Sequence, residues 1–354
     1  MADFIDPAPR HGGDLAFATA RYGAPAAGWL DLSTGINPRP YPAPPVASQD
    51  LSRLPDRDAL SALVASGRGV YGVPAEVPLI ATPGSEIALR LLPLVAPEGG
   101  VGIVSPTYPS HGEAWANAGR PVLRLAGTDA VADVVSVVVV TNPNNPDGRA
   151  FPPRRLAELA AQLGRRGGLL VVDEAFADLA PEASLIPRLA GLPAVVLRSF
   201  GKFFGLPGLR FGFVVGAEGC VARLEALLGD WPVSGPAIAI GKAALADTQW
   251  RDETRQQLAR DAARLRSLLA GHGLAVVGGT DLFVLCATPD TGALHRRLGE
   301  RGIWTRAFAE ERTWLRFGLP ADDAAFARLD RALAEIMASA AAAAPAEPPA
   351  SAAR

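Results

Sequence analysis

Short apolar runs bounded by Gly and Pro recur through the middle of the chain. They cover residues 101–104, 134–140, 169–172, 195–197 and 211–215. Runs of this length without polar alternation are typical of strands buried on both faces of a sheet. Helical patterns at 85–94 and 153–163 alternate with these runs. Strands that alternate with helices predict an α/β fold with a mainly parallel, doubly wound sheet.

The pattern changes near Trp231, which indicates a second domain. Its expected elements are a long Arg-rich helix, two short strands and a closing helix, at about 252–270, 275–277, 282–286 and 324–337. We expect four segments: a Pro-rich arm (1–40), a large domain (41–235), a smaller α/β domain (236–338) and a tail (339–354). The tail is almost wholly Ala, Pro, Ser and Glu. Because such a segment cannot pack an apolar core, we expect it to be disordered.

The charge balance excludes some classes of function. The chain has 34 Lys and Arg against 36 Asp and Glu, a formal net charge of -2, whereas a protein that binds nucleic-acid backbones needs a basic balance. The longest aliphatic run, 134–140, is too short to cross a membrane, and the N-terminus lacks the apolar centre of a signal peptide. Two cysteines and four histidines show no metal or disulfide spacing. We therefore expect a cytoplasmic protein without a metal.

Residues 199–213, SFGKFFGLPGLRFGF, carry the most informative motif. Lys202 lies in an apolar, Gly-punctuated turn after a predicted strand. Desolvation favours the neutral amine of a lysine, the form that attacks an aldehyde to make a Schiff base. Ser199 and Arg210 are spaced to hold a phosphate beside that lysine. The segment alone leaves another interpretation open, a surface turn whose lysine extends its apolar stem along the protein.

Three further segments predict ligand contacts, each with an ordinary structural alternative. TPGSE (82–86) places Gly84 and Ser85 at a helix start, where N–H groups favour an anion, although Ser there is often only an N-cap. VVDEAF (171–176) ends a strand with Asp173, at the edge where open α/β sheets bind ligands, although the carboxylate could simply cap a loop. TNPNNPDG (141–148) also follows a strand, and turn building accounts for most of its Asn residues.

In order and spacing these four segments resemble the fold-type I pyridoxal-phosphate enzymes, specifically the class I/II aminotransferase superfamily, from about His11 to Gly318. The resemblance implies a large domain with a mainly parallel, seven-stranded type of sheet flanked by helices, and a smaller C-terminal α/β domain. It implies pyridoxal 5'-phosphate as cofactor, with Lys202 as the catalytic Schiff-base lysine. Asp173 would pair with the pyridinium nitrogen, Asn145 would bond the ring's 3-oxygen, and Tyr108 would stack on the ring. The other implied cofactor contacts are Gly84, Ser85, Glu86, Phe176, Ser199 and Arg210.

Within the superfamily, the chain resembles the histidinol-phosphate aminotransferases and the threonine-phosphate decarboxylases of cobalamin biosynthesis. The N-terminal HGGDLAFATARYG (11–23) and WLDLSTGINPRPYP (29–42) favour the decarboxylases. By this resemblance His11 and Asn37 would line the substrate pocket. Arg316 in WLRFGL would bind the substrate carboxylate, and Arg306 in GIWTRAF the substrate phosphate. In another context both would be surface arginines.

The chain departs from its relatives at three positions. Phe176 in DEAF replaces the usual tyrosine and cannot hydrogen-bond the ring oxygen. Gly201 stands where a serine often precedes the lysine. Leu54 in SRLPDRDAL replaces a tyrosine that, in relatives, reaches the partner's cofactor phosphate across a homodimer. A homodimer is still expected. We interpret His111, three residues after Tyr108, as a loop histidine rather than a ligand contact.

These observations lead to one main functional hypothesis and its alternatives. We expect decarboxylation of L-threonine O-3-phosphate to (R)-1-amino-2-propanol phosphate. The alternatives are a histidinol-phosphate-type aminotransferase and a catalytically silent protein of the same fold. Decarboxylation and transamination differ in which bond of the substrate aligns with the cofactor's π system, and the sequence does not give that angle. A nucleotide-binding domain is disfavoured, since no G-x-G-x-x-G or P-loop motif follows a strand.

Overall fold

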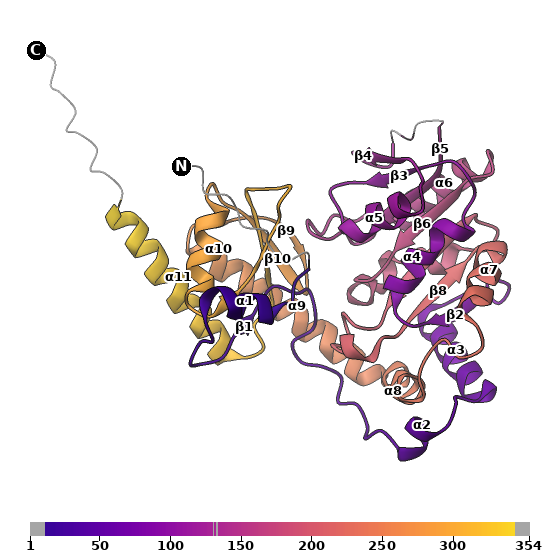
Figure 1. The fold of residues 1–354 in the computed structure, drawn as a ribbon, viewed down its shortest axis with the longest axis horizontal. Helices are drawn as coiled ribbons and strands as arrows, with labels where there is room; N and C mark the ends of the chain where they lie inside the picture. Colours follow the sequence, from indigo (N-terminus) through magenta and orange to yellow (C-terminus); the bar gives the residue numbers. More distant parts are fainter. Residues whose placement is uncertain (1–10, 130, 132–133, 344–354) are drawn as a thin grey trace, which may run out of the picture. The chain divides into compact units, whose positions relative to one another are not determined.

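The computed structural model describes residues 11–129, 131 and 134–343, which form two compact units. The larger unit contains residues 36–260 and 278–282, and the smaller unit contains the described parts of 1–35, 261–277 and 283–354. The expected N-terminal arm therefore belongs mostly to the smaller unit. The ribbon in Figure 1 is coloured along the chain and shows both units.

The larger unit contains a seven-stranded sheet of order β2-β8-β7-β6-β5-β3-β4. Its strands are β2 (Leu79–Thr82), β3 (Gly100–Val104), β4 (Val122–Leu125), β5 (Val135–Thr141), β6 (Leu169–Asp173), β7 (Ala194–Ser199) and β8 (Gly212–Gly216). All neighbouring pairs are parallel except the two that involve β8, which is antiparallel to both β2 and β7. The predicted α/β fold with a mainly parallel sheet is confirmed.

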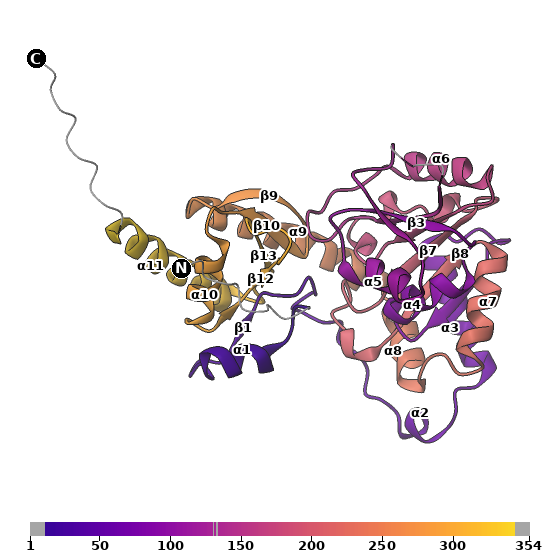
Figure 2. The same cartoon turned by 45° about the horizontal axis from the view of Figure 1, so that its top comes forward.

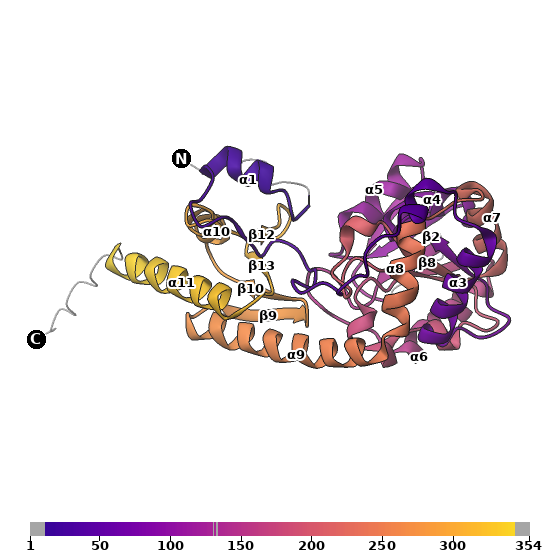
Figure 3. The ribbon, with the colours of Figure 1, turned by 90° about the horizontal axis from the view of Figure 1, so that it is seen from below.

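Helices cover both faces of this sheet. On one face α4 (Ser85–Val95), α5 (Pro109–Asn117) and α7 (Glu218–Leu228) bury apolar side chains in a common core with alternate residues of the strands. Helix α6 (Pro153–Gly164) packs on β6 from the other side, as Figures 2 and 3 show. Its side chains at 156, 159, 160 and 163 are all fully buried. This i, i+3, i+4, i+7 spacing places them on one helical face.

Two further helices of the larger unit, α3 (Arg57–Tyr71) and α8 (Gly235–Ala246), pack against each other, and the short α2 (Ser48–Ser52) packs on α8. The ends of α3 follow from local sequence. The Asp56 side chain accepts a hydrogen bond from the Ala59 N–H at 2.6 Å and caps the first turn. Gly72 ends the helix at φ 62°, a left-handed conformation that glycine adopts without strain. Helix α9 (Thr248–Gly271) follows α8, and its residues up to Arg260 belong to the larger unit.

A four-stranded sheet of order β12-β13-β10-β9 belongs to the smaller unit, except for residues 278–280 of β9, which are part of the larger unit. Its strands are β9 (Ala275–Thr280), β10 (Phe283–Ala287), β12 (Arg306–Ala307) and β13 (Trp314–Gly318). Near the N-terminus, α1 (Leu15–Tyr22) is followed by β1 (Leu30–Asp31), which pairs in parallel with β11 (Ile303–Trp304). An aromatic cluster of Phe17, Tyr22, Trp29 and Trp304 packs this N-terminal segment onto the unit.

The C-terminal elements are α10 (Thr291–Gly299) and α11 (Asp323–Ala343). Helix α11 extends past the expected end of the small domain at 338, because the Ala-rich sequence there has high helix propensity. The expectation of disorder is therefore wrong for 339–343, and residues 344–354 of the expected tail lie outside the described residues. Among the described residues, none of the helices is both long and apolar enough to span a membrane.

Candidate active site

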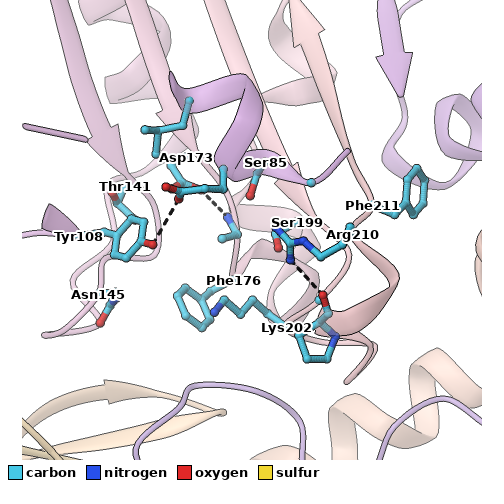
Figure 4. Close-up of a pocket in the computed structure, with 16 residues that line it drawn as sticks. Ser85, Tyr108, Thr141, Asn145, Asp173, Phe176, Ser199, Lys202, Arg210 and Phe211 are labelled. Atoms are coloured by element: carbon cyan, nitrogen blue, oxygen red, sulfur yellow. Dashed lines mark hydrogen bonds between the residues drawn. The ribbon is translucent and has the colours of Figure 1, made fainter. Parts of the chain in front are cut away.

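A cavity in the larger unit lies at the carboxyl ends of β5, β6 and β7, and Figure 4 shows its lining. Its walls come from the strand ends and from the first turn of α4. The lining residues are Gly84, Ser85, Glu86, Leu89, Tyr108, Thr141, Asn145, Asp173, Ala175, Phe176, Ser199, Gly201, Lys202, Pro207, Arg210 and Phe211. The structure thus brings together in one cavity every residue that the family resemblance implies as a cofactor contact.

One end of the cavity is suited to an anion. Helix α4 begins at Ser85, and the first-turn N–H groups of a helix have no partner within the helix. Gly84 precedes them at φ 86°, and a Cβ there would lie 3.0 Å from Arg210 Nη2. A Cβ at Gly212 would lie 3.0 Å from the Ser85 nitrogen. Only glycines at these positions let the arginine and the strand approach the helix start this closely, so backbone donors and a guanidinium converge there.

The loop of Arg210 is held in an unusual conformation. Arg210 has φ 51°, in the left-handed region, and its Nη1 donates to the Pro207 carbonyl at 2.9 Å. A non-glycine residue in this region costs conformational energy and is therefore kept by its surroundings. The carbonyl contact fixes the direction of the guanidinium, which Figure 4 shows beside Ser199.

Another part of the cavity is lined by the carboxylate of Asp173, at the end of β6. Asp173 Oδ1 accepts the Ala175 N–H at 3.0 Å, and Oδ2 lies 3.0 Å from His111 Nε2. Asp173 is 5% exposed and His111 is 1% exposed. The expectation that His111 is a loop histidine is wrong, because it lies in the first turn of α5 and its ring contacts this carboxylate. An Nε2–H that donates to Oδ2 would hold the Asp173 carboxylate in this orientation.

Tyr108 lies against the cavity beside the first turn of α4. Its hydroxyl donates to Glu86 Oε2 at 3.2 Å, and Glu86 Oε1 also pairs with Arg90 Nη2 at 2.7 Å. Burial and the neighbouring Glu86 charge raise the pKa of Tyr108 to about 12, although a hydrogen bond with Ser110 acts in the opposite direction. The phenol therefore stays protonated at neutral pH, and Glu86 fixes the orientation of its ring.

Lys202 extends into the cavity from the loop that follows β7, as Figure 4 shows. Its Nζ lies 5.9 Å from the centroid of the Phe176 ring. The loop is fixed by the neighbouring phenylalanines, since Phe200, Phe203 and Phe204 are at most 1% exposed. A Cβ at Gly201 would lie 3.0 Å from Pro207 Cα. This close backbone contact gives a physical reason for glycine where relatives often have serine.

The asparagines in the loop after β5 have two kinds of position: two of them form hydrogen bonds within or next to the loop, and one lines the cavity. Asn144 Nδ2 donates to the Pro106 carbonyl at 2.9 Å and to Asp147 Oδ1 at 2.7 Å, and Asn142 Oδ1 accepts the Phe151 N–H at 2.7 Å. The prediction that most of these asparagines build the turn is confirmed for both. Asn145 instead lines the cavity.

Asn37 belongs to the larger unit, where it contacts the lysine loop. Its backbone N–H donates to the Lys202 carbonyl at 3.0 Å, and its Nδ2 donates to the Phe203 carbonyl at 2.9 Å. Its Oδ1 accepts the Arg39 N–H at 2.9 Å, and the residue is 2% exposed. Asn37 therefore anchors the segment that carries the lysine, a role that the sequence did not indicate. Its predicted substrate contact stays a prediction.

The other three predicted substrate residues lie in the smaller unit. His11 is exposed, whereas Arg306 and Arg316 are paired neighbours on β12 and β13. Arg316 is 6% exposed, and its Nη2 donates to the Ser33 carbonyl at 2.8 Å. Burial, together with the nearby Arg306 charge, lowers the pKa of Arg316 to about 9. Two adjacent guanidiniums of which one is buried favour an anionic ligand.

Comparison with known proteins identifies the family to which this chain belongs. The sequence profile described as aminotransferase class I and II matches residues 47–334. The chain belongs to this family. It is 44% identical to a threonine-phosphate decarboxylase from Pseudomonas aeruginosa, over 91% of this chain and 96% of the relative. It is also 44% identical to a threonine-phosphate decarboxylase from Sinorhizobium sp, over 92% of this chain and 98% of the relative.

Solved structures that are more distant in sequence share the fold. A histidinol-phosphate aminotransferase from Clostridium acetobutylicum has a TM-score of 0.76 at 21% identity, covering 88% of this chain and 99% of that one. An L-threonine-O-3-phosphate decarboxylase from Porphyromonas gingivalis has a TM-score of 0.72 at 19% identity, covering 87% of this chain and 99% of that one. The predicted membership of the class I/II aminotransferase superfamily is confirmed.

Proposed function

We propose that this chain is a pyridoxal-phosphate-dependent carboxy-lyase that converts L-threonine O-3-phosphate to (R)-1-amino-2-propanol phosphate and carbon dioxide, in cobalamin biosynthesis. The 44% identity to two threonine-phosphate decarboxylases, over nearly their whole length, carries the proposal. A histidinol-phosphate aminotransferase from Geobacter is 29% identical over 80% of this chain. Transamination is therefore the second candidate, and the lower identity favours decarboxylation over it.

The cavity fits pyridoxal phosphate by the chemistry of its lining. The start of α4, Ser199 and Arg210 would bind the phosphate dianion, because N–H groups and a guanidinium converge where Cβ atoms would not fit. Asp173 would accept the ring N–H, and Asn145 would bond the ring oxygen. Lys202 would supply the amine that holds the cofactor's aldehyde carbon.

When bound, pyridoxal phosphate supplies an electron-accepting ring that makes loss of a group from the substrate's α-carbon feasible. Asp173 would keep a proton on the ring nitrogen, and His111, 3.0 Å from its Oδ2, fixes the orientation of the carboxylate. Lys202 Nζ would return a proton to the α-carbon after carbon dioxide has left. Tyr108, fixed by Glu86, would exclude water from one face of the ring.

The residues proposed to bind substrate decide which bond breaks. Arg316 would bind the carboxylate and Arg306 the phosphate, with His11 and Asn37 as further contacts. The side chains that hold the substrate carboxylate would decide whether carbon dioxide or the α-proton is lost, because they would set which bond of the α-carbon is oriented for cleavage. The two reactions thus require the same cofactor site and differ only in how these side chains hold the substrate.

Incubation of the purified holoenzyme with L-threonine O-3-phosphate tests the proposal. We expect stoichiometric release of carbon dioxide and aminopropanol phosphate without a keto acid. Amino-group exchange that requires a keto acid and gives pyridoxamine phosphate would establish the aminotransferase instead. A protein that binds the cofactor but reacts with neither L-threonine O-3-phosphate nor histidinol phosphate would be the silent relative.

We also propose that the chain acts as a homodimer. The larger unit exposes large apolar side chains at Leu51 (74% exposed), Leu54 (68%) and Trp231 (56%). Apolar groups of this size are commonly covered by a partner. Light scattering tests this, and a monomer across the micromolar range would contradict it. Cytoplasmic localisation stays a prediction.

A further inference from the structure

Three charged side chains are buried together beside the strand ends that carry the cavity residues. They are Glu174, Asp178 and Arg198, here called the Arg198 cluster, and they are 0%, 4% and 2% exposed. Arg198 Nη1 pairs with Glu174 Oε2 at 3.0 Å, and Nη2 pairs with Asp178 Oδ1 at 2.5 Å. One guanidinium therefore bridges two carboxylates that come from a different segment of the chain.

Each member of the Arg198 cluster is close in sequence to a cavity residue. Glu174 directly follows Asp173, Asp178 lies two residues after Phe176, and Arg198 directly precedes Ser199. Successive residues of a strand point to opposite faces of the sheet. Asp173 and Ser199 accordingly line the cavity, whereas Glu174 and Arg198 do not. The cluster therefore joins the ends of β6 and β7 behind the cavity.

Other elements fix the members of the cluster in place. Glu174 accepts the Ser184 hydroxyl at 2.6 Å and the Leu185 N–H at 2.7 Å. The Tyr71 ring lies 4.3 Å from Arg198 Cζ, and Arg255 Nε donates to the Asp178 carbonyl at 2.8 Å. The cluster is thus held by α3, by the segment after β6 and by α9, and it has little freedom to move.

Stability alone does not account for this arrangement. Burial raises the pKa of Glu174, although the Arg198 charge acts in the opposite direction. Among the described residues, Asp178 Oδ2 and Arg198 Nε have no hydrogen-bond partner. Buried ion pairs are often no more stabilising than apolar side chains of the same volume, and unsatisfied buried atoms lower stability further. The geometry that the cluster imposes is a more direct explanation.

We propose that the Arg198 cluster is a positioning device that sets the spacing between Asp173 and Ser199, and hence between the ring-nitrogen site and the phosphate site of the cofactor. The proposal rests on the proposed cofactor. The three members of the Arg198 cluster do not line the cavity. They would therefore act as positioning residues rather than catalytic ones. The affinity for a ligand that occupies both sites at once should depend on the cluster. The affinity for a ligand that occupies only one of the two sites should not.

Two conservative variants test this spacing. Arg198→Lys keeps the positive charge, but one ammonium cannot hold two carboxylates in the fork geometry of a guanidinium. Glu174→Gln keeps one oxygen that can accept the Leu185 N–H and turns its amide NH2 toward the Ser184 hydroxyl, which can accept, but it loses the ion pair. The matched control is Leu163→Ala, because Leu163 is fully buried beside Gly168, at the opposite end of β6. Melting temperatures of the cofactor-free proteins measure the loss of stability in all three.

The readout is the dissociation constant of three probes: pyridoxal phosphate, pyridoxal and inorganic phosphate. We expect both cluster variants to weaken binding of pyridoxal phosphate by roughly 10- to 100-fold, with the two single-site probes changed by less than about 3-fold. In Leu163→Ala all three constants should stay near those of the unchanged protein.

Two results would overturn the proposal. One is unchanged affinity for pyridoxal phosphate in both cluster variants, and the other is an equal loss for all three probes, which would indicate collapse of the site. The proposed function fails separately, if the unchanged protein binds pyridoxal phosphate but releases no carbon dioxide from L-threonine O-3-phosphate. The binding constants would still decide the role of the cluster in that case.

Discussion

His111 Nε2 lies 3.0 Å from Asp173 Oδ2, and both side chains are almost fully buried. A buried carboxylate is costly unless it accepts hydrogen bonds, and Asp173 accepts them from one backbone N–H and from this ring. The pair thus fixes the Asp173 carboxylate at the end of the cavity proposed to bind the ring nitrogen of the cofactor.

We expect His111→Ala to weaken binding of pyridoxal phosphate. Loss of a hydrogen bond to a charged group is worth about 1.5–3 kcal/mol, or roughly 10- to 100-fold in the dissociation constant. Fluorescence titration of the cofactor measures it. His111→Gln, which keeps a donor, should recover part of the affinity, and equal affinity in all three proteins would contradict the role of the pair.

Lys202→Ala should abolish decarboxylation and covalent attachment of the cofactor. The chain contains only one other lysine, Lys242, which provides a matched control. Borohydride reduction of the holoenzyme followed by peptide mass spectrometry should show the cofactor on Lys202 alone. Lys242→Ala should keep both the label and the activity, and a label on Lys242 would refute the assignment.

Gly84→Ala should weaken binding at the phosphate end. Gly84 has φ 86° and ψ 154°, a region that costs a residue with a Cβ about 1–3 kcal/mol. The added atom would also lie 3.0 Å from Arg210 Nη2. Dissociation constants for pyridoxal phosphate and for inorganic phosphate should both rise. The control is Gly112→Ala in α5, where the Cβ would meet no described atom within 4 Å.

Asn37→Ala and Asn37→Asp should both lower kcat. Either change removes the hydrogen bond to the Phe203 carbonyl and leaves it unsatisfied in a buried place, at a cost of about 1–3 kcal/mol. The lysine loop would lose one of its anchors, so the visible absorbance of the bound cofactor should change as well. Steady-state kinetics separate this role from a substrate contact, which would raise KM and leave kcat and the absorbance unchanged.

His295 should make the smaller unit sensitive to acid. Burial, with the nearby charges of Arg306 and Arg21, lowers the pKa of His295 from 6.5 to about 4. The neutral ring is the form that the folded state favours, so its contribution is present above pH 6.5 and is lost as the pH falls toward 4. The loss approaches about 3 kcal/mol. Denaturant unfolding at several pH values measures it, and His295→Gln should flatten the profile.

The sequence predicted many of the residues that line the cavity because several of them lie just after strands. Asp173 and Ser199 end apolar runs, and the carboxyl edge of a parallel sheet is where such residues gather. The strands β2 and β4 were not predicted; β4 contains Arg124 and is exposed at three of its four positions, so it lacks the buried apolar run on which the prediction depends. The antiparallel direction of β8 was not predicted either, although the short link between β7 and β8 leaves no room for a helical crossover.

Contacts between distant segments could not be predicted from local pattern. His111 and Asp173 are 62 residues apart, and nothing near His111 indicates a carboxylate partner. Asn37 and Phe203 are 166 residues apart. Arg198 and Glu174 are charged residues at the ends of apolar runs, where composition gives no sign that they meet. Each of these contacts depends on the strand order, which a single sequence leaves open.

The pairing of β1 with β11 has a consequence during synthesis on the ribosome. Leu30 and Asp31 pair with Ile303 and Trp304, and the Gly318 N–H donates to the Leu32 carbonyl at 2.7 Å. Residues 30–32 therefore emerge well before the residues at 303–318 with which they pair. Translation at the usual rate makes this delay on the order of tens of seconds. During that time the larger unit can fold, whereas Phe17 and Tyr22 of α1 lack their native contacts with Trp304 and are candidates for chaperone binding.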